Sequence, residues 1–368
     1  MKFFEKIGRK LGVSELNIEF IRSHISLCGQ DVSSCFSKDP RIASFFQFKK
    51  DNPDTVLLSA DKTQDYVILT TDQYHEKIRN FLDSPKYQKV NDFDLHFEME
   101  AYRNLLKCTM EGCVGQQNGF LIQPLSSIAN FYGKVKVHKE NWPIRGICTG
   151  YSHMVFGAET YLKKLLNPLI SRCSYLVDSQ LSFKNKFIEQ KTKFREQDHE
   201  IVSFDIIQMY PSINITKTIN YILTAIYRNP RNFFKEKNSQ GQLLPYPTRE
   251  QFKLFLLGVL SDFNYFETQL GIFKQIQGVQ MGSSLAPLIA NLFIGCLERS
   301  VIKKLTKQGH IITWLRYTDD NLAIIKKRSF DLILHELNNW DQNISYSFEK
   351  ITENQLNFLS TTAVYRFC

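Results

Sequence analysis

The stretch TWLRYTDDNLAII spans residues 313–325 and is the most informative part of the sequence. Apolar residues lie on both sides of Asp319 and Asp320, and Asn321 follows them in a cluster that favours a turn. Two β-prone runs around such a cluster predict a hairpin over residues 313–325 with carboxylates at its tip. Taken alone, the cluster is explained equally well as an ordinary polar turn.

A further acid interrupts a second β-prone run. IVSFDII, residues 201–207, consists of β-branched and aromatic residues around Ser203 and Asp205. A carboxylate inside an apolar strand is costly unless something compensates its charge. If this strand lies beside the hairpin, Asp205 meets Asp319 and Asp320, although 319 − 205 = 114 positions separate them. The alternative is a simple acid at a strand end.

Three converging carboxylates predict a site for two Mg²⁺ ions, with Mn²⁺ as an alternative ion. Two ions roughly 3.5–4 Å apart activate an attacking 3′-hydroxyl and stabilise a leaving pyrophosphate. We therefore predict Asp205, Asp319 and Asp320 as catalytic and metal-binding residues that share one pocket.

Tyr210 follows Asp205 in the order DIIQMYPSI, where the strand gives way to a turn. A ring at this place could exclude a 2′-hydroxyl and so select deoxynucleotides; a packing tyrosine is the alternative. Downstream, QGVQMGSSLAPLIAN at 277–291 has two glycines that permit close backbone approach, and Pro287 marks the first turn of a helix. This loop suits contact with a nucleotide or nucleic acid. Six helical residues are assigned to the core: Leu288, Ile289, Leu292, Phe293, Cys296 and Leu297.

The bulk composition bounds the class of protein. The 368 residues carry a formal net charge of +9 with a pI near 9.0, which favours a polyanionic partner such as nucleic acid over a merely basic protein. The longest apolar run, Leu254–Leu260, is far shorter than a membrane span, so we predict no membrane association. Eight cysteines without CxxC spacing predict reduced thiols and an intracellular location.

Local patterns place several elements outside the acid motifs. The run TVLLSADKTQDYVIL at 55–69 predicts strand, turn and strand, followed by a helix that begins near Thr71. Residues 228–247 are polar and contain prolines, which predicts an exposed loop. Thr248 and Gln251 then form a capping-box pattern, so a buried helix should follow through about Ser261.

Three of these segments, in order, resemble motifs of the reverse transcriptase family. FDIIQMYPSI at 204–213 is similar to its first aspartate motif, QGVQMGSSLAP at 277–287 to its glycine-rich motif, and RYTDD at 316–320 to its Y-x-D-D motif. ADKTQDYVILTTDQY at 60–74 and FYGKVKVHKENWPIRGI at 131–147 resemble the finger motifs of Penelope-like retroelements, which are relatives of telomerase reverse transcriptase. The resemblance covers about residues 55 to 365.

The resemblance implies an α+β right-hand polymerase fold with fingers and a palm, the palm being an antiparallel sheet backed by helices. We expect a helical N-terminal leader at 1–50, fingers at 51–200 and a palm at 201–368. A thumb is expected to be absent or truncated, and low processivity would follow because a thumb holds the duplex through phosphate contacts.

The resemblance also implies roles for individual residues. Asp205, Asp319 and Asp320 would bind metal together with the Ile206 carbonyl, and Tyr210 would be the steric gate. A second group would lie beside the incoming nucleotide and template: Gln277, Gly278 and Gly282. A third group would contact the triphosphate or the template strand, unless it is only a solvated basic face: Lys62, Lys136, Lys139 and Arg145. The finger motif departs from the family at Lys134-Val135 and at Gly146, so its loop path is expected to differ.

The implied function is that of an RNA-directed DNA polymerase, with a primer on an RNA or DNA template and dNTPs as partners, and a nuclear location by likeness to retroelements. Two alternatives stay open: an RNA-templated RNA polymerase, and an inactive retroelement-derived protein that only binds nucleic acid. Comparing dNTP with rNTP incorporation distinguishes an RNA-templated RNA polymerase from the implied DNA polymerase. The effect of Asp205→Asn on synthesis and on binding distinguishes an active enzyme from a protein that only binds nucleic acid.

Overall fold

The computed structural model describes residues 47–350 and the strands at 355–358 and 361–364, except 49, 64, 120–123, 126, 150–152 and 191–192. The predicted leader at 1–50 lies almost wholly outside the described residues. The chain divides into two compact units, one of residues 1–81 with 133–145 and one of 82–132 with 146–368. The boundary predicted near residue 200 remains a prediction.

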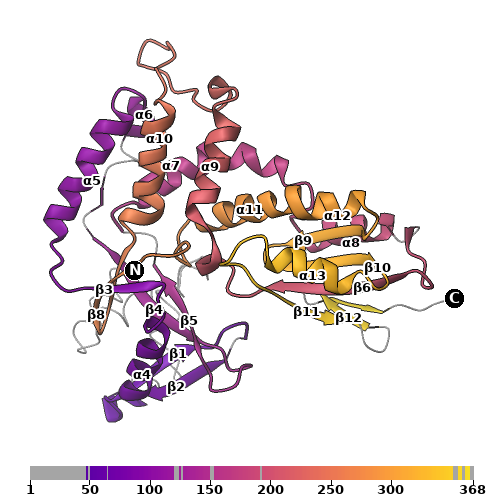
Figure 1. The fold of residues 1–368 in the computed structure, drawn as a ribbon. Helices are drawn as coiled ribbons and strands as arrows, with labels where there is room; N and C mark the ends of the chain where they lie inside the picture. Colours follow the sequence, from indigo (N-terminus) through magenta and orange to yellow (C-terminus); the bar gives the residue numbers. More distant parts are fainter. Residues whose placement is uncertain are drawn as a thin grey trace, which may run out of the picture. The chain divides into compact units, whose positions relative to one another are not determined.

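The first unit contains a hairpin and a helix (Figure 1). Strand β1 (Thr55–Ser59) pairs antiparallel with β2 (Tyr66–Thr70). Helix α4 (Thr71–Leu82) follows at once, because Thr70 and Gln73 exchange side-chain and backbone hydrogen bonds of 2.9 and 3.2 Å at its start. The predicted order of strand, turn, strand and helix is confirmed.

The second unit is built around a four-stranded antiparallel sheet in the order β11-β6-β10-β9. Its members are β6 (His199–Ile206), β9 (Ile311–Tyr317), β10 (Asp320–Lys326) and β11 (Tyr346–Lys350). The predicted hairpin is the pair β9–β10, and the predicted acid-bearing strand is β6, which pairs directly with β10. Both predictions are confirmed.

Alternation along these strands gives the sheet two different faces. One face packs Val202, Phe204 and Ala323 into the main core with α11 (Ala286–Leu297) and α13 (Phe330–Asn338). On it Phe204 stacks on Phe330 at 6.0 Å between ring centroids. The other face carries Ile201, Leu322 and Ile324 in a smaller cluster with Phe183 of α8 (Gln180–Gln190). Figure 1 shows α11 running alongside this sheet.

A second sheet has the order β3-β8-β7-β4-β5. Its strands are β3 (Tyr87–Val90), β8 (Gly271–Gln275), β7 (Tyr265–Thr268), β4 (Ala129–Val135) and β5 (Ile144–Cys148). The remaining elements include α5 (Leu95–Met110), α6 (Gln116–Gly119), α7 (Phe156–Leu166), α9 (Ile215–Ile226), α10 (Arg249–Leu257), α12 (Lys303–Lys307), β12 (Gln355–Phe358) and β13 (Thr361–Val364).

Two predicted helix starts and one predicted helix end are confirmed. Thr248 and Gln251 form the capping box that starts α10, and Pro287 lies in the first turn of α11. The helix predicted through about Ser261 is also confirmed: its α-helical part ends at Leu257 and a π-helical turn, Gly258–Asp262, continues it. Within the described part of the chain, every helix is too short or too polar to cross a bilayer.

Candidate active site

The central feature of the site is a pair of acids on neighbouring strands. Asp205 of β6 stands directly opposite Asp320 of β10, and Tyr317 of β9 stands opposite Asp320 on the other side. Directly opposite residues of an antiparallel pair project to the same face, with Cβ atoms about 4.5–5.5 Å apart. The strand register therefore gathers Asp205 and Asp320 on one sheet face, as predicted.

This acid pair lies at the open end of that face. Going along the strands from the α8 side, the cross-strand pairs are Ile201 with Ile324, then Ser203 with Leu322, then Asp205 with Asp320. The first two pairs include buried apolar side chains, whereas Asp205 is exposed and Asp320 partly exposed. The face thus changes from packed core to solvent within two residues of each acid, which leaves access for a charged ligand.

Asp319 belongs to the two-residue turn between β9 and β10. Thr318, before it, has a φ of 55°, a left-handed conformation that a β-branched residue seldom adopts. The Thr318 hydroxyl donates to Asp319 Oδ1 at 2.8 Å, and Ile206 donates its amide to the Asp319 carbonyl at 3.3 Å. Strain of this kind, of order 1–3 kcal/mol, is typical of functional sites held in place by their surroundings.

The strands and the turn bring the backbones of the three acids close together, but the three side chains do not form one group. Among the residues that the structure describes, no three His, Cys, Asp or Glu side chains form a group that could hold a metal ion. Two carboxylates in directly opposite strand positions repel each other, and hard oxygen donors of this type suit Mg²⁺ or Mn²⁺. The donor set fits a divalent cation once Asp319 and its two partners turn toward a common point.

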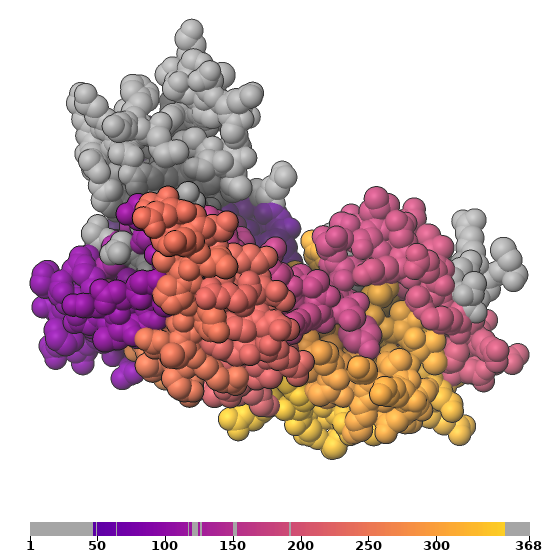
Figure 2. Space-filling model, turned by 90° about the horizontal axis from the view of Figure 1, so that it is seen from above, coloured from indigo at the N-terminus to yellow at the C-terminus, as the bar shows by residue number. Residues whose placement is uncertain are grey.

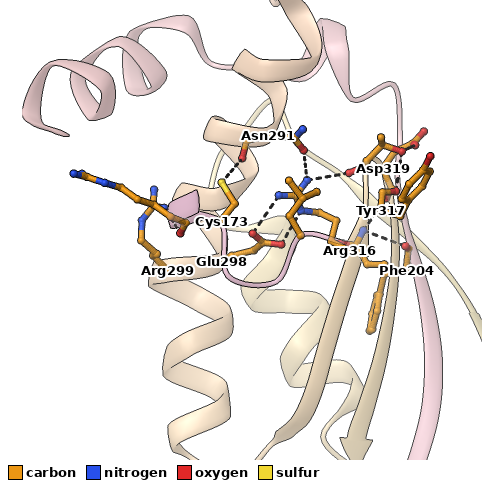
Figure 3. Close-up of polar contacts among 12 residues, drawn as sticks. Cys173, Phe204, Asn291, Glu298, Arg299, Arg316, Tyr317 and Asp319 are labelled. Atoms are coloured by element: carbon orange, nitrogen blue, oxygen red, sulfur yellow. Dashed lines mark hydrogen bonds and ion pairs between the residues drawn. The ribbon is translucent and has the colours of Figure 1, made fainter. Parts of the chain in front are cut away.

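A buried arginine holds the hairpin from the opposite face (Figure 3). Arg316 is fully buried, and its Nε and Nη2 donate to the Glu298 carboxylate at 2.7 and 3.3 Å. Its Nη1 donates to Asn291 Oδ1 at 2.6 Å and to the Thr318 carbonyl at 3.3 Å. Burial acts to lower the pKa of Arg316, but the Glu298 charge and hydrogen bonds outweigh it and the pKa is raised. Arg316 thus connects the helical core to the strained turn.

The glycine-rich loop packs on the turn that follows β6. Gly278 has a φ of 70°, and a Cβ on it would lie 2.4 Å from the Tyr210 carbonyl oxygen and 2.5 Å from Pro211 Cα. Val279 donates its amide to the same Tyr210 carbonyl at 3.0 Å. The structure therefore brings the predicted gate residue and the predicted loop together through backbone contact.

The other loop residues are placed by separate contacts. Gly282 has a φ of 109°, and its Cβ would lie 2.0 Å from the Cys148 carbonyl oxygen, so any side chain there would displace the loop. Gln277 is partly buried, and its carbonyl accepts a 2.8 Å hydrogen bond from the Gln275 side chain. Both predicted glycines are thus explained by close backbone approach.

We predict that Gly278→Ala lowers the free energy of unfolding by about 3 kcal/mol or more, because steric overlap adds to the strain of the left-handed backbone. Gly309 is a matched control: its φ is 78° and no described atom lies within 4 Å of its Cβ position. Gly309→Ala should cost only about 1–2 kcal/mol. Urea unfolding of both variants measures the difference, and equal losses would contradict a role for the Tyr210–Pro211 contact.

A buried glutamate supports the end of the loop. Glu159 of α7 is 3% exposed and accepts hydrogen bonds from the Ser283 hydroxyl at 2.5 Å and the Ser284 amide at 3.2 Å. His153 Nε2 lies 3.4 Å from the same carboxylate. These contacts fix the start of α11, on which Asn291 also stands.

Lys86 brings a cation to the turn after β6. Its Nζ donates to Gln208 Oε1 at 2.9 Å, three positions beyond Asp205, and its carbonyl accepts the Ile276 amide at 2.9 Å. Gln208 itself has a φ of 49°. Burial lowers the pKa of Lys86. Lys86 thus joins the segment after β6 to the segment that leads into the glycine-rich loop.

The four predicted finger cations belong to the first unit, where they gather with one another. Burial lowers the pKa of Lys136, and the nearby charges of Arg145, Lys139 and Lys62 lower it further, while Asp61 acts against them. Arg145 Nε lies 3.2 Å from Asp61 Oδ2, an ion pair without hydrogen-bond geometry. Asp61 is only 6% exposed. A concentrated positive group of this kind suits a polyphosphate.

Sequence patterns did not identify four supporting residues: Asp61, Lys86, Glu159 and Arg316. Arg316 stood inside a quoted motif, yet its buried position opposite Asn321, which in turn pairs with Phe204, follows only from the sheet register. For Arg316, the signal in the sequence was a charged residue within an otherwise apolar strand, the same signal that identified Asp205.

The sequence matches no protein-family model and no curated protein. Among solved structures, the chain is similar to telomerase from Candida tropicalis in complex with the TWJ fragment of telomeric RNA, with a TM-score of 0.56 and 11% identity over 82% of this chain and 49% of that one. Apo telomerase from the same organism has a TM-score of 0.56 and 11% identity, over 87% of this chain and 57% of that one. Telomerase from Candida albicans in complex with the TWJ fragment has a TM-score of 0.53 and 9% identity, over 83% of this chain and 52% of that one.

The chain spans about half the length of these telomerase structures. At such low identity the likeness concerns the fold. The antiparallel sheet with its acid-bearing hairpin, backed by α11 and α13, agrees with it. The chain has a reverse-transcriptase-like right-hand polymerase fold of the mixed α+β class, as the sequence predicted.

Proposed function

We propose that the chain is an RNA-directed DNA polymerase of the Penelope-like type, which joins dNTPs to a primer 3′-hydroxyl on a template. The observation that carries the proposal is the register that sets Asp205 opposite Asp320, with Asp319 in the adjoining turn. The quoted finger motifs at 60–74 and 131–147 favour the Penelope-like type. A telomerase with a similar fold has a solved structure in complex with a fragment of telomeric RNA, which supports an RNA template here.

The acids would hold two divalent ions together with the Ile206 carbonyl, and ions bound there would activate the primer hydroxyl and neutralise charge on the leaving pyrophosphate. The chain's own residues do the rest. Arg316 and Asn321 hold the turn that presents Asp319, since Asn321 Nδ2 donates to the Asp319 carbonyl at 2.7 Å and to the Phe204 carbonyl at 3.2 Å. The loop of Gly278 fixes Tyr210.

The finger cations would bind the triphosphate. Lys136 and Arg145 lie among like charges, so binding a polyanion relieves their mutual repulsion. As the leaving group gains negative charge, fixed cations stabilise it without reorganisation. Asp61 would orient Arg145 through their ion pair and limit its movement.

Primer extension with Mg²⁺ on matched RNA and DNA templates tests the proposal. Extension on the RNA template with dNTPs is the expected result. Extension with rNTPs alone would favour an RNA-templated RNA polymerase instead. Tight binding of primer–template with no product under either condition would favour the inactive binding protein.

We predict that Tyr210→Ala relaxes sugar selection. Removing the ring opens the space that a 2′-hydroxyl needs, so the preference for dNTP over rNTP, as a ratio of kcat/KM values, should fall by on the order of tenfold or more. Tyr221→Phe is the control and should leave the ratio unchanged, because this tyrosine of α9 has a hydroxyl without a hydrogen-bond partner among the described residues. An unchanged ratio in Tyr210→Ala would show that Tyr210 only packs.

A further inference from the structure

A pocket formed by α6, α7 and the 228–247 loop lies in the same unit as the acid pair. Its volume is about 530 Å³, within the range of roughly 300–1,000 Å³ that ligand sites span. Residues that line it include Asn118, Tyr161, Lys164 and Phe233. In the view from above, the loop and α10 lie at the surface beside α5 (Figure 2).

Glu236 joins the 228–247 loop to the segment that begins α6. Its Oε1 accepts from Asn118 Nδ2 at 2.9 Å and its Oε2 accepts from the Gly115 amide at 3.1 Å. A Cβ on Gly115 would lie 2.6 Å from the Lys237 carbonyl oxygen, so the two backbones pack directly. Asn238 Oδ1 closes the turn by accepting from the amides of residues 240 and 242 at 3.0 and 2.9 Å.

This arrangement leaves positive charge on the rim of the pocket. Lys164, Lys235 and Lys237 line the pocket and are exposed. Within the described ranges none of their ammonium groups forms a hydrogen bond or ion pair, and the carboxylate of the neighbouring Glu236 accepts from the Gly115 amide and the Asn118 side chain. Glu236 also lines the pocket, so three cations and one carboxylate leave a net positive charge, which attracts an anion.

Tyr161 provides a second and independent indication of a ligand. It lines the pocket, is 3% exposed, and its hydroxyl has no hydrogen-bond partner among the described residues. Burial raises the pKa of Tyr161, and the nearby Glu236 and Cys113 raise it further, so the hydroxyl stays protonated and able to donate. A buried hydroxyl without a partner is unfavourable in the free protein and would be satisfied by an acceptor oxygen.

We infer that this pocket binds a phosphate of a nucleic acid strand, with Lys164, Lys235 and Lys237 around the phosphate and Phe233 beside a base. The choice of a strand over a free anion rests on the proposed function and on the exposed lysines, which suit a chain that continues beyond the pocket. Lysines act here as point charges, so binding would be strong at low salt and weak in sequence preference.

The test measures binding of a fluorescent single-stranded RNA oligonucleotide by anisotropy, without divalent ions, over a range of salt concentrations. For the Lys235→Ala, Lys237→Ala variant we expect about tenfold weaker binding at low salt and a slope of log Kd against log salt reduced by about 1.4, or 0.7 per lost phosphate contact. The matched control is Lys303→Ala, Lys307→Ala on α12, which removes the same charge and should change neither.

Tyr161→Phe separates a binding role from a structural one. We expect affinity to fall about threefold to tenfold with the salt slope unchanged, since a neutral donor is lost, and the melting temperature to stay equal or rise. Equal losses in the pocket and control lysine variants, or unchanged affinity in both pocket variants, would overturn the inference. Competition by inorganic triphosphate or a mononucleotide as effective as the oligonucleotide would overturn the assignment to a strand.

Primer extension by the wild-type chain is measured separately from this binding. If extension fails while binding still depends on the pocket lysines, the proposed function falls and this site stands. If extension succeeds while binding ignores the pocket lysines, only this inference falls.

Discussion

Asp205→Asn should reduce Mg²⁺-dependent primer extension by on the order of a thousandfold or more, while binding of primer–template changes little. Asparagine keeps the size of the side chain and its place opposite Asp320, but it removes the negative charge that a divalent ion needs. Single-turnover extension with saturating dNTP measures the loss, and anisotropy with the same primer–template measures binding.

Asp331→Asn is the matched control, since Asp331 is an exposed aspartate in the first turn of α13. It should extend primers at the wild-type rate. Full activity in Asp205→Asn would show that the acid pair takes no part in catalysis. A parallel loss of binding and extension would mean that Asp205 acts through template binding.

Arg316→Met should lower the free energy of unfolding by about 3–5 kcal/mol, because it leaves Glu298 buried with no positive partner. Adding Glu298→Met should restore much of that stability, since replacing both members of a buried ion pair by apolar residues is often neutral. Extension by the double variant should stay low even so, because the hydrogen bond from Arg316 to the Thr318 carbonyl is still missing.

Urea unfolding and extension rates of the single and double variants check these expectations. Lys304→Met is the control: it breaks the half-exposed Lys304–Glu336 pair of 3.0 Å and should cost no more than about 1 kcal/mol. Recovery of both stability and activity in the double variant would show that Arg316 matters for folding alone and does not position the turn.

Local signals in the sequence were enough for the hairpin and the acid-bearing strand. Each combines an apolar β-prone run with a misplaced acid, and the two strands pair as expected, with Asp320 opposite Asp205. The Thr248–Gln251 cap and Pro287 likewise marked helix starts because capping depends on residues within one turn.

Long-range packing set what the sequence did not reveal. Gly258 lies against Leu105 of α5, and there the helical segment changes from α-helical to π-helical geometry. Glu159 meets Ser283 from 124 positions away, and Lys235 and Lys237 reach the pocket beside Tyr161 only through the fold. Contacts of this kind leave no periodic trace, because each partner looks like an ordinary surface or core residue.

Cleavage by bound Fe²⁺ tests the convergence of the acids most directly. Fe²⁺ replaces Mg²⁺ at oxygen-rich sites, and with ascorbate and peroxide it cuts the backbone close to where it binds. We expect two cuts from one bound centre, one near Asp205 and one near Asp319, both lost in the Asp319→Ala, Asp320→Ala variant and suppressed by excess Mg²⁺. Cuts at only one of these segments, or at neither, would contradict it.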